Sequence, residues 1–302
     1  MALPFDIGVV LPLAQFGPDR ITPRWSDIRL MAGRAEEMGF DTLWTPDELL
    51  WRVPDASPQG MWDGVSMAGA VAATTSRAKV GTWVLSALHR NPGIIAKTAE
   101  TLDEISGGRF VFGLGAGHEW PGQARAFGLP EDRIFARFEE ALRIIVPLMR
   151  KGHADFEGEF HAARDLPQQP AGPRPNAIPL LIGGNGPKGQ RYAALHADTW
   201  SGYAEERASV EELGPRLATL DAICEEVGRD PTTIGRGAGV SVNPLEPSGW
   251  RASVISGSAE EIADALRSFR EAGFTQVDIM LGPGTLEAFE AMAPVLELVR
   301  AD

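Results

Sequence analysis

The feature that most constrains the fold is an eightfold alternation of short apolar stretches with amphipathic helical stretches along the 302 residues. The first unit is FDIGVVL, residues 5–11, followed by WSDIRLMAGRAEEMGF, and the last is QVDIML followed by GTLEAFEAMAPVLELVR. Continuous apolar runs indicate strands buried on both faces, and such strands form parallel sheets covered by helices. Eight strand–helix units in a chain of this length predict a TIM (β/α)8 barrel that forms a single domain, 1–302.

Two stretches interrupt the alternation and are predicted to be insertions at the carboxyl-terminal mouth of the barrel. The segment 152–176 is rich in Pro and polar residues and contains LPQQPAGPRPN. The segment 243–257 precedes a helix whose Ser258 and Glu261 fit a capping box. Because the loops after the strand carboxyl ends form the active sites of such barrels, the functional residues are sought there.

Composition narrows the choice of partner and compartment. Acidic residues outnumber basic ones by 41 to 28, with no marked Lys/Arg cluster, which argues against nucleic acid or an anionic membrane and favours a small molecule. One cysteine excludes an internal disulfide and is typical of a cytoplasmic protein. Pro12 interrupts the amino-terminal apolar run, which therefore resembles neither a signal peptide nor a membrane span. The five histidines lack metal-binding spacing, so no metal is expected.

Two glycine-rich loops follow strands and differ in what they can bind. In FVFGLGAGHEW, His118 stands where a dinucleotide fingerprint needs its third glycine, and Pro121 blocks an immediate helix start. The loop GGNGPKG does open a helix, where free N–H groups and Lys188 can hold a phosphate. A plain turn is the alternative for both loops. We assign the phosphate to the second loop and expect the first to bring backbone close to a ligand.

Polar side chains gather in the loops after the second and third strands. Asp47 and Glu48 are adjacent, so their side chains diverge and cannot act as a facing carboxylate pair. Either can hydrogen-bond a ligand or cap a backbone N–H. His89 precedes Asn91–Pro92, a helix-start signal. It is expected to face the mouth, and whether it contacts a ligand there is left open. Together these residues predict a barrel enzyme that binds a flat, phosphorylated cofactor without metal.

Several blocks, among them RNPGIIAKTAETLDEISGGRFVFGLGAG and IPLLIGGNGP followed by ADTWS, resemble the bacterial luciferase-like superfamily of flavin- and deazaflavin-dependent oxidoreductases. The likeness covers nearly the whole chain and implies a TIM barrel with a flavin or the deazaflavin coenzyme F420 at its mouth. The RNP loop and the Asp47–Glu48 pair resemble the F420-dependent branch. Glu48 stands where that branch more often has histidine, which leaves His118 as the nearest proton donor, and these two residues are the catalytic candidates.

The resemblance also implies the residues that bind cofactor and substrate. The implied cofactor-binding residues are Asp47, Ser86, Ala87, Gly115, Ala116, Gly117, His118, Gly183, Gly184, Asn185, Gly186, Pro187 and Lys188. The substrate is expected over the ring, among Trp44, Trp51, His89 and Trp120, with His118 beside it. A cis peptide in the third strand is a further implication, with Trp83–Val84 as the candidate bond.

The first function expected from this resemblance is hydride transfer between coenzyme F420 and a small organic substrate. The second is an FMN-dependent monooxygenase that uses O2 and reduced flavin from a flavin reductase. The third is a non-catalytic flavin-binding barrel. Apolar helix faces outside the barrel make a homodimer the expected assembly.

Overall fold

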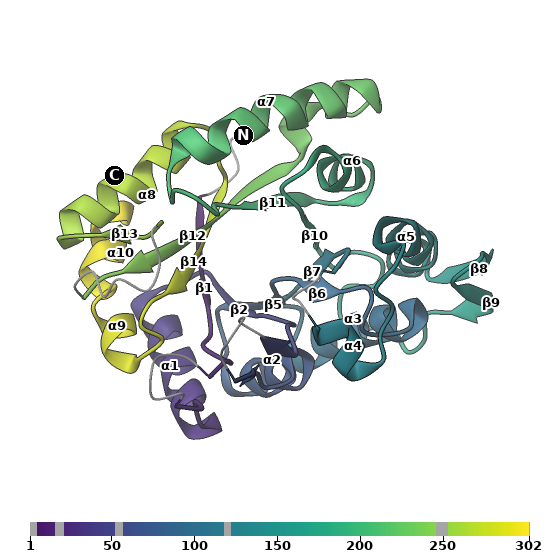
Figure 1. The fold of residues 1–302 in the computed structure, drawn as a ribbon, viewed down its shortest axis with the longest axis horizontal. Helices are drawn as coiled ribbons and strands as arrows, with labels where there is room; N and C mark the ends of the chain where they lie inside the picture. The colour runs from purple at the N-terminus through teal and green to yellow at the C-terminus, as the bar shows by residue number, and fades with distance from the viewer. Residues whose placement is uncertain (1–4, 16–20, 52–56, 118–121, 246–252, 302) are drawn as a thin grey trace.

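The structure, a computed structural model, describes residues 5–15, 21–51, 57–117, 122–245 and 253–301 (Figure 1). Parallel strands close into a barrel in which β7 pairs with β10 and β14 pairs with β1. The barrel strands are β1 (Asp6–Val10), β2 (Thr42–Thr45), β5 (Lys79–Thr82), β7 (Phe110–Gly115), β10 (Leu180–Gly183), β11 (Thr199–Tyr203), β12 (Gly235–Asn243) and β14 (Gln276–Leu281). This eight-stranded closed sheet confirms the predicted TIM barrel.

Helices surround the barrel, and local sequence signals account for where several of them begin. The helices that follow the barrel strands are α1 (Trp25–Met38), α2 (Gly64–Thr74), α3 (Pro92–Ser106), α5 (Ile134–Lys151), α6 (Pro187–His196), α7 (Val210–Glu226), α8 (Ala259–Glu271), α9 (Leu286–Glu290) and α10 (Ala293–Arg300). Asn91 caps α3 by accepting hydrogen bonds from two backbone N–H groups, and Ser258 with Glu261 forms the predicted capping box of α8. Figure 1 shows these helices as an outer ring.

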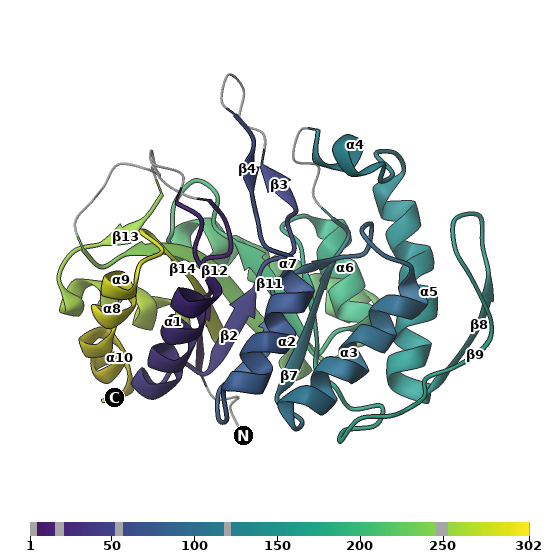
Figure 2. The same ribbon diagram turned by 90° about the horizontal axis from the view of Figure 1, so that it is seen from below.

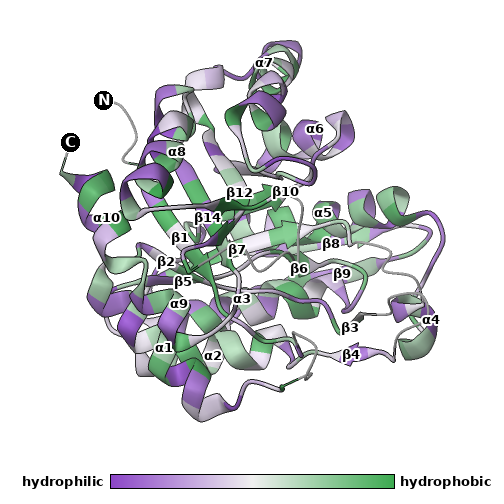
Figure 3. Ribbon diagram, turned by 60° about the vertical axis from the view of Figure 1, so that its left-hand side comes forward, coloured by the Kyte–Doolittle hydropathy of each residue, from purple (hydrophilic) through white to green (hydrophobic). Residues whose placement is uncertain are grey.

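The hydrophobic core lies mainly between the barrel and its helices. Figure 3 shows β10 and β12 in the hydrophobic colours, as expected for strands covered on both faces. The barrel interior is also filled. Trp44 of β2 is fully buried there and donates a 2.6 Å hydrogen bond from Nε1 to Oδ1 of Asp278 on β14. Val10 and Leu181 form a small hydrophobic cluster with Trp44.

The prediction that the segment 152–176 covers the mouth is wrong. Its strands β8 (His153–Glu157) and β9 (Ala162–Pro167) form an antiparallel hairpin that runs along the outside of α3 and α5 (Figure 2). Gln168 Nε2 donates to the Ala96 carbonyl of α3 at 2.7 Å, and the Gly172 N–H donates to Glu100 at 2.7 Å. Polar groups of this segment therefore form hydrogen bonds with the outer helix α3. Composition alone does not distinguish this role from that of an insertion over the barrel mouth.

The mouth is built instead by shorter pieces of chain. These are the β3 (Leu50–Trp51) and β4 (Gln59–Gly60) hairpin, β6 (Leu85–Ser86), α4 (Gln123–Phe127) and β13 (Ile255–Ser256). Figure 2 shows the β3–β4 hairpin and α4 rising above the same end of the barrel. Of the insertion 243–257, Ser253 donates from Oγ to the Glu205 carbonyl at 3.1 Å, which keeps its described end at the mouth. In the described ranges, no helix is long and apolar enough to cross a membrane.

Candidate functional site

A cavity of about 1310 Å³ opens at the carboxyl ends of the barrel strands. Its wall comes from the loops after β2, β5, β7, β10 and β11, together with parts of α4, α5 and α6. Small-molecule sites usually enclose about 300–1,000 Å³, so this cavity has room for a cofactor and a substrate together. In the part of the chain that the structure describes, no His, Cys, Asp and Glu cluster could hold a metal.

The structure brings most of the sequence-predicted site residues to this cavity. The predicted residues in its wall are Asp47, Glu48, Ser86, His89, Gly115, Ala116, Gly117, Gly183, Gly184, Asn185, Gly186, Pro187 and Lys188. Ala87 does not line it, because this residue is buried behind the wall and its N–H donates to the Gly115 carbonyl at 3.0 Å. His118, Trp120 and the side chain of Trp51 lie outside the described residues.

Trp44 is a correction to the predicted substrate site. The sequence places it in the second strand, close to the mouth, but its side chain points into the barrel interior and has no exposed surface. Successive strand residues face opposite sides of the sheet, and this one faces inward to Asp278, 234 positions away in the chain. Trp44 is therefore buried inside the barrel and does not line the cavity.

Asp47 is held by four donors. Its carboxylate accepts from the Ser86 N–H at 2.9 Å, from His89 Nδ1 at 3.2 Å, and from both terminal nitrogens of Arg90 at 2.7 and 2.9 Å. Asp47 is 2% exposed. A carboxylate with these bonds has little capacity left for a ligand. Its role in the structure is to fix the loop 86–90, which itself lines the cavity.

His89 lies in the cavity wall with both ring nitrogens engaged. Gln123 Oε1 accepts from the N–H groups of Leu49 at 2.7 Å and Leu50 at 3.0 Å, so its Nε2 is the donor toward His89 Nε2 at 3.4 Å. His89 Nε2 must then accept, which leaves the proton on Nδ1, facing Asp47. This chain of hydrogen bonds joins α4 to the loops after β2 and β6. The role of Gln123 in it could not be predicted from sequence spacing.

Glu48 differs from its neighbour because its carboxyl group has an unsatisfied oxygen. Oε2 is inaccessible to solvent and has no hydrogen-bond partner among the residues that the structure describes. Burial raises the pKa of the Glu48 carboxyl above its ordinary value, against the lowering effect of a backbone hydrogen bond, and the Asp47 charge adds to the rise. Buried polar atoms are seldom left without partners in proteins, and such exceptions call for a functional explanation.

The glycines that end β7 and β10 allow the segment Trp83–Val84 to form part of the wall. The peptide between these two residues is cis, as predicted. A Cβ on Gly115 would lie 2.7 Å from a Val84 methyl carbon, and one on Gly183 would lie 3.1 Å from another. The glycines therefore make room for Val84, which itself borders the cavity.

Gly117→Ala is expected to destabilise the protein more than Gly128→Ala. Both glycines have positive φ, +98° and +67°, where a Cβ costs about 1–2 kcal/mol. At Gly128 nothing lies within 4 Å of the added carbon, whereas at Gly117 Ser86 Oγ is 2.7 Å away. Urea unfolding of both variants separates backbone strain from the clash, and equal losses would argue against close packing at Gly117.

The first turn of α6, where the sequence predicts an anion site, borders the cavity. Gly186 caps the helix without a side-chain bond, and the Lys188 side chain lines the cavity with its ammonium 5.1 Å from the centre of the Phe135 ring. No carboxylate of the described residues pairs with this lysine. Asn185, by contrast, uses its side chain structurally, accepting from Tyr203 N–H at 2.8 Å and donating to its carbonyl at 2.9 Å.

Trp83, Tyr203 and Met280 line the cavity, although sequence analysis did not assign them to substrate or cofactor. The rings of Trp83 and Tyr203 meet edge to face, with centroids 5.8 Å apart, and Trp83 Nε1 donates to Ser201 Oγ at 3.2 Å. The indole thus spans from β5 across to β11. Trp83 lies inside a strand-like run, KVGTWVLS, and only the interruption between β5 and β6 turns it toward the mouth.

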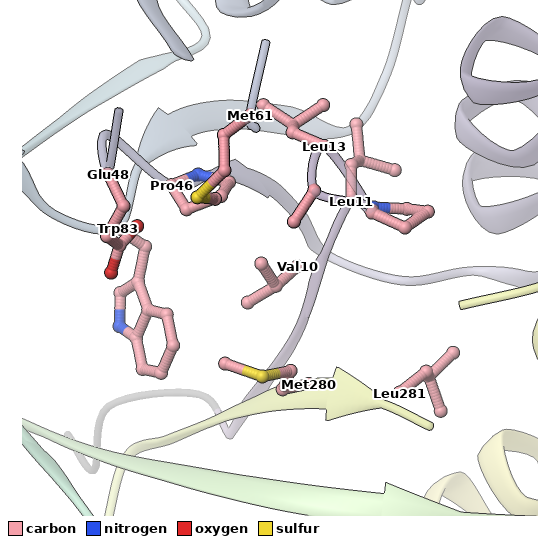
Figure 4. Close-up of a pocket in the computed structure, with 11 residues that line it drawn as sticks. Val10, Leu11, Leu13, Pro46, Glu48, Met61, Trp83, Met280 and Leu281 are labelled. Atoms are coloured by element: carbon pink, nitrogen blue, oxygen red, sulfur yellow. The ribbon is translucent and has the colours of Figure 1, made fainter. Parts of the chain in front are cut away.

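A second, smaller pocket of about 50 Å³ adjoins this cavity. It shares Glu48, Trp83 and Met280 with the larger one, and its other lining residues are Val10, Leu11, Pro12, Leu13, Ala14, Pro46, Met61 and Leu281. Figure 4 shows the Glu48 carboxyl group next to Trp83, with Val10 and Met280 around the same space. Among the described residues of this otherwise apolar lining, Glu48 is the single ionisable one.

Curated relatives with F420-dependent activities match most of the chain. The F420-dependent glucose-6-phosphate dehydrogenase of Nakamurella multipartita is 32% identical over 240 residues, which cover 74% of this chain and 67% of that protein. The F420-dependent hydroxymycolic acid dehydrogenase of Mycobacterium tuberculosis is 29% identical over 238 residues, covering 77% and 61%. Across the first three relatives, the chain spans 55–67% of their length.

Solved structures of similar fold cover nearly the whole chain. An F420-dependent secondary alcohol dehydrogenase in complex with an F420-acetone adduct superposes with a TM-score of 0.79 at 20% identity, covering 99% of this chain and 100% of that one. The tetrahydromethanopterin reductase of Methanopyrus kandleri gives 0.76 at 18%, covering 99% of both chains, and a long-chain alkane monooxygenase gives 0.75 at 15%, covering 98% and 92%. At these identities the likeness establishes the fold.

One family model matches the greater part of the barrel. It is described as the luciferase-like monooxygenase family, and the match runs over residues 5–244, from β1 to the end of β12. The matched region contains the Asp47–Arg90 cluster, the glycines after β7 and β10, and the first turn of α6. The chain therefore belongs to the luciferase-like monooxygenase family of oxidoreductases.

Proposed function

We propose that this protein transfers a hydride between coenzyme F420 and a small organic substrate. The observation that carries the proposal is the cavity of about 1310 Å³, which has a helix start with free N–H groups at one side and, at another, the Glu48 carboxyl group, whose Oε2 has no hydrogen-bond partner among the described residues. The F420-dependent names of the relatives support the choice of cofactor. When bound, coenzyme F420 supplies a two-electron hydride donor or acceptor.

The residues present fit such a group. The free N–H groups of the first turn of α6, with the Lys188 ammonium, provide a positive end for phosphate. The glycine-lined wall beside Val84 offers an apolar surface without bulky side chains for a flat ring. Trp83 and Met280 close the floor, where they keep water from the hydride path. Asp47 holds the loop 86–90 and so sets the shape of the wall between these parts.

A flavin-dependent monooxygenase is the second candidate. It is supported by the family description and by the fold similarity to a long-chain alkane monooxygenase. The two candidates differ in the cofactor that binds. Titration of the purified protein with F420 and with FMN, followed by quenching of cofactor fluorescence, separates them. Tight FMN binding with no F420 binding would overturn the first candidate, and cofactor binding without turnover of any substrate would favour a non-catalytic barrel.

Lys188→Ala is expected to weaken F420 binding about ten- to a hundredfold, because a charge-assisted bond to phosphate contributes about 1.5–3 kcal/mol. The matched control is Arg191→Ala, which removes the same charge from the same helix at a side chain that pairs with Glu226, away from the cavity. Fluorescence quenching measures both dissociation constants. Equal affinity in the two variants would mean that the lysine does not reach the phosphate.

A further inference from the structure

The turn of the β8–β9 hairpin, residues 158–161, docks on the first two turns of α5. The Glu140 carboxylate accepts hydrogen bonds from three consecutive backbone N–H groups, those of residues 159–161, at 2.8, 2.7 and 3.0 Å. Figure 2 shows the hairpin alongside α5, with its turn toward the end of the molecule where α4 lies. One side chain of α5 thus satisfies three donors of the turn and fixes the turn against the helix.

Two arginines at the same end of the helix hold the aromatic ring of this turn. The guanidiniums of Arg133 and Arg137 lie over the Phe160 ring, 4.5 and 4.3 Å from its centroid. Arg133 also pairs with both carboxylate oxygens of Glu159, at 2.5 and 2.9 Å. A guanidinium over an aromatic face is attracted by the ring quadrupole. The turn therefore contacts α5 through a ring and a carboxylate in addition to its backbone.

Arg133 has an unusual backbone conformation at the point where α5 begins. It is the residue just before the helix, and its φ of +52° and ψ of +35° lie in the left-handed region. This region is disfavoured for arginine, because the Cβ atom approaches the following carbonyl oxygen too closely. Such a conformation persists where surrounding contacts hold it, and these conformations cluster near functional sites. The contacts that hold Arg133 are those to Glu159 and Phe160.

The opposite face of the same two turns lines the large cavity. Successive helix residues are about 100° apart around the axis, so Phe135 and Phe138 project away from the side chains that hold the hairpin turn. Both are in the cavity wall. Phe138 meets the Tyr192 ring of α6 edge to face, with centroids 5.3 Å apart, and the Phe135 ring carries the Lys188 ammonium 5.1 Å from its centre. The first two turns of α5 therefore lie between the hairpin turn and the start of α6.

We propose, resting on the F420 binding proposed above, that Glu140 is a positioning residue for the phosphate end of the cavity. It anchors the hairpin turn, the anchored turn fixes where α5 begins, and Phe135 then keeps the Lys188 ammonium beside the start of α6. Glu140 itself touches neither cofactor nor substrate, because it lies on the outer face of the helix. The insertion 152–176 thus shapes the cavity from outside the barrel.

The test is a double-mutant cycle on F420 affinity with the full chain. Glu140→Ala is expected to raise the F420 dissociation constant about three- to tenfold, because the wall is in its binding-competent arrangement for a smaller fraction of the time. In the Lys188→Ala background the same change should raise it less than about twofold, since the side chain through which Glu140 acts is gone. Equal losses in the two backgrounds, or no loss in the wild-type background, would overturn the proposal.

Glu139→Ala is the matched control, because Glu139 is the neighbouring acid of α5 and pairs with the exposed Arg143 at 3.2 Å. It should leave F420 affinity within about twofold of wild type. Urea unfolding checks that each variant is folded during the titration. If Glu140→Ala is not folded, Phe160→Leu takes its place, because it removes the ring and keeps the backbone N–H groups of the turn. It should show the same dependence on Lys188.

A second readout needs no cofactor. The Phe135 ring should move the NMR signals of the Lys188 methylene protons next to the ammonium upfield, because these protons lie near its face. Phe135→Leu should abolish this shift and Glu140→Ala should reduce it, whereas an unchanged shift in Glu140→Ala would overturn the proposal.

The two readouts separate this proposal from the proposed function. If the wild-type chain binds FMN and not F420, the F420 function fails, and the same cycle with FMN, which also carries a phosphate, decides the role of Glu140. If the chain binds neither cofactor, the F420 function fails and the NMR shift decides that role. If F420 binds and the cycle shows no coupling between Glu140 and Lys188, the F420 function stands and the positioning role is wrong.

Discussion

Replacing Asp278 by asparagine is expected to make the protein more stable than wild type at about pH 8, by as much as about 4 kcal/mol in the free energy of unfolding. Asp278 is fully buried inside the barrel, where its carboxyl oxygens accept from Trp44 Nε1 at 2.6 Å and Gln276 Nε2 at 2.7 Å. Burial raises the pKa of the Asp278 carboxyl to about 7, against these two hydrogen bonds, which lower it. Asparagine keeps the acceptor for Trp44 and cannot ionise.

The direction of the pH dependence follows from the raised pKa. Because the folded-state pKa of about 7 lies above the ordinary value of 3.8, the native state binds this proton more tightly than the unfolded chain does. The stability associated with protonated Asp278 is therefore complete below about pH 4, decreases as the pH rises to about 7, and is lost above that. The amide side chain of the Asp278→Asn variant does not titrate and contributes no such slope, so the two proteins should diverge within this window.

Urea unfolding followed by circular dichroism at about pH 5 and about pH 8 measures the effect. The quantity that matters is the difference between wild type and Asp278→Asn at each pH, because other groups titrate equally in both proteins. Asp155→Asn replaces an exposed carboxyl and should leave the wild-type pH profile unchanged. A wild-type-to-variant difference that is the same at both pH values would contradict a raised pKa at Asp278.

The barrel could be predicted because its signals are local and repeated. Each strand is a continuous apolar run, and caps such as Asn91 and Ser258 mark helix starts within a few residues. Where an element depends on distant partners, the prediction failed. Residues 152–176 pack along α3 because Gln168 and Arg174 satisfy a carbonyl and the buried Asp103 carboxylate there. Such long-range pairings cannot be predicted from sequence spacing.

In the candidate site, too, the features set by local sequence could be predicted and those set by distant partners could not. Parallel strands end at one rim, so the loops that line the cavity could be named from the order of elements alone. What each polar atom does in that rim depends on neighbours far along the chain. Asn185 is engaged by Tyr203, and Asp47 by Arg90, 43 positions away. Glu48 stands out for the opposite reason, because its Oε2 has no partner in the described part of the chain. Only the folded arrangement distinguishes these two adjacent acids.

The second large effect is expected at Asp47. Asp47→Asn should destabilise the protein by about 3–5 kcal/mol, the usual cost of removing one member of a buried ion pair, because the exposed Asp63 carboxylate, 3.0 Å from Arg90, compensates the remaining charge only in part. The charge left behind is Arg90, whose guanidinium loses its two-bond pairing with the carboxylate. The His89 N–H and the Ser86 N–H lose their charged acceptor at the same time. Since these groups fix the loop 86–90, cofactor affinity should fall together with stability.

Asp63→Asn is the matched control, because Asp63 is the other carboxylate that pairs with Arg90, at 3.0 Å. Its side chain is 46% exposed, and exposed ion pairs contribute about 0–1 kcal/mol. Asparagine at this position keeps the cap of α2, where the Asp63 oxygen accepts from the Ser66 N–H at 2.7 Å. Urea unfolding and F420 titration of both variants then compare a buried with an exposed partner of one arginine. Similar losses of stability and F420 affinity in the two variants would mean that the buried Asp47–Arg90 pair does not hold the loop 86–90. The cavity wall would then depend on Arg90 alone.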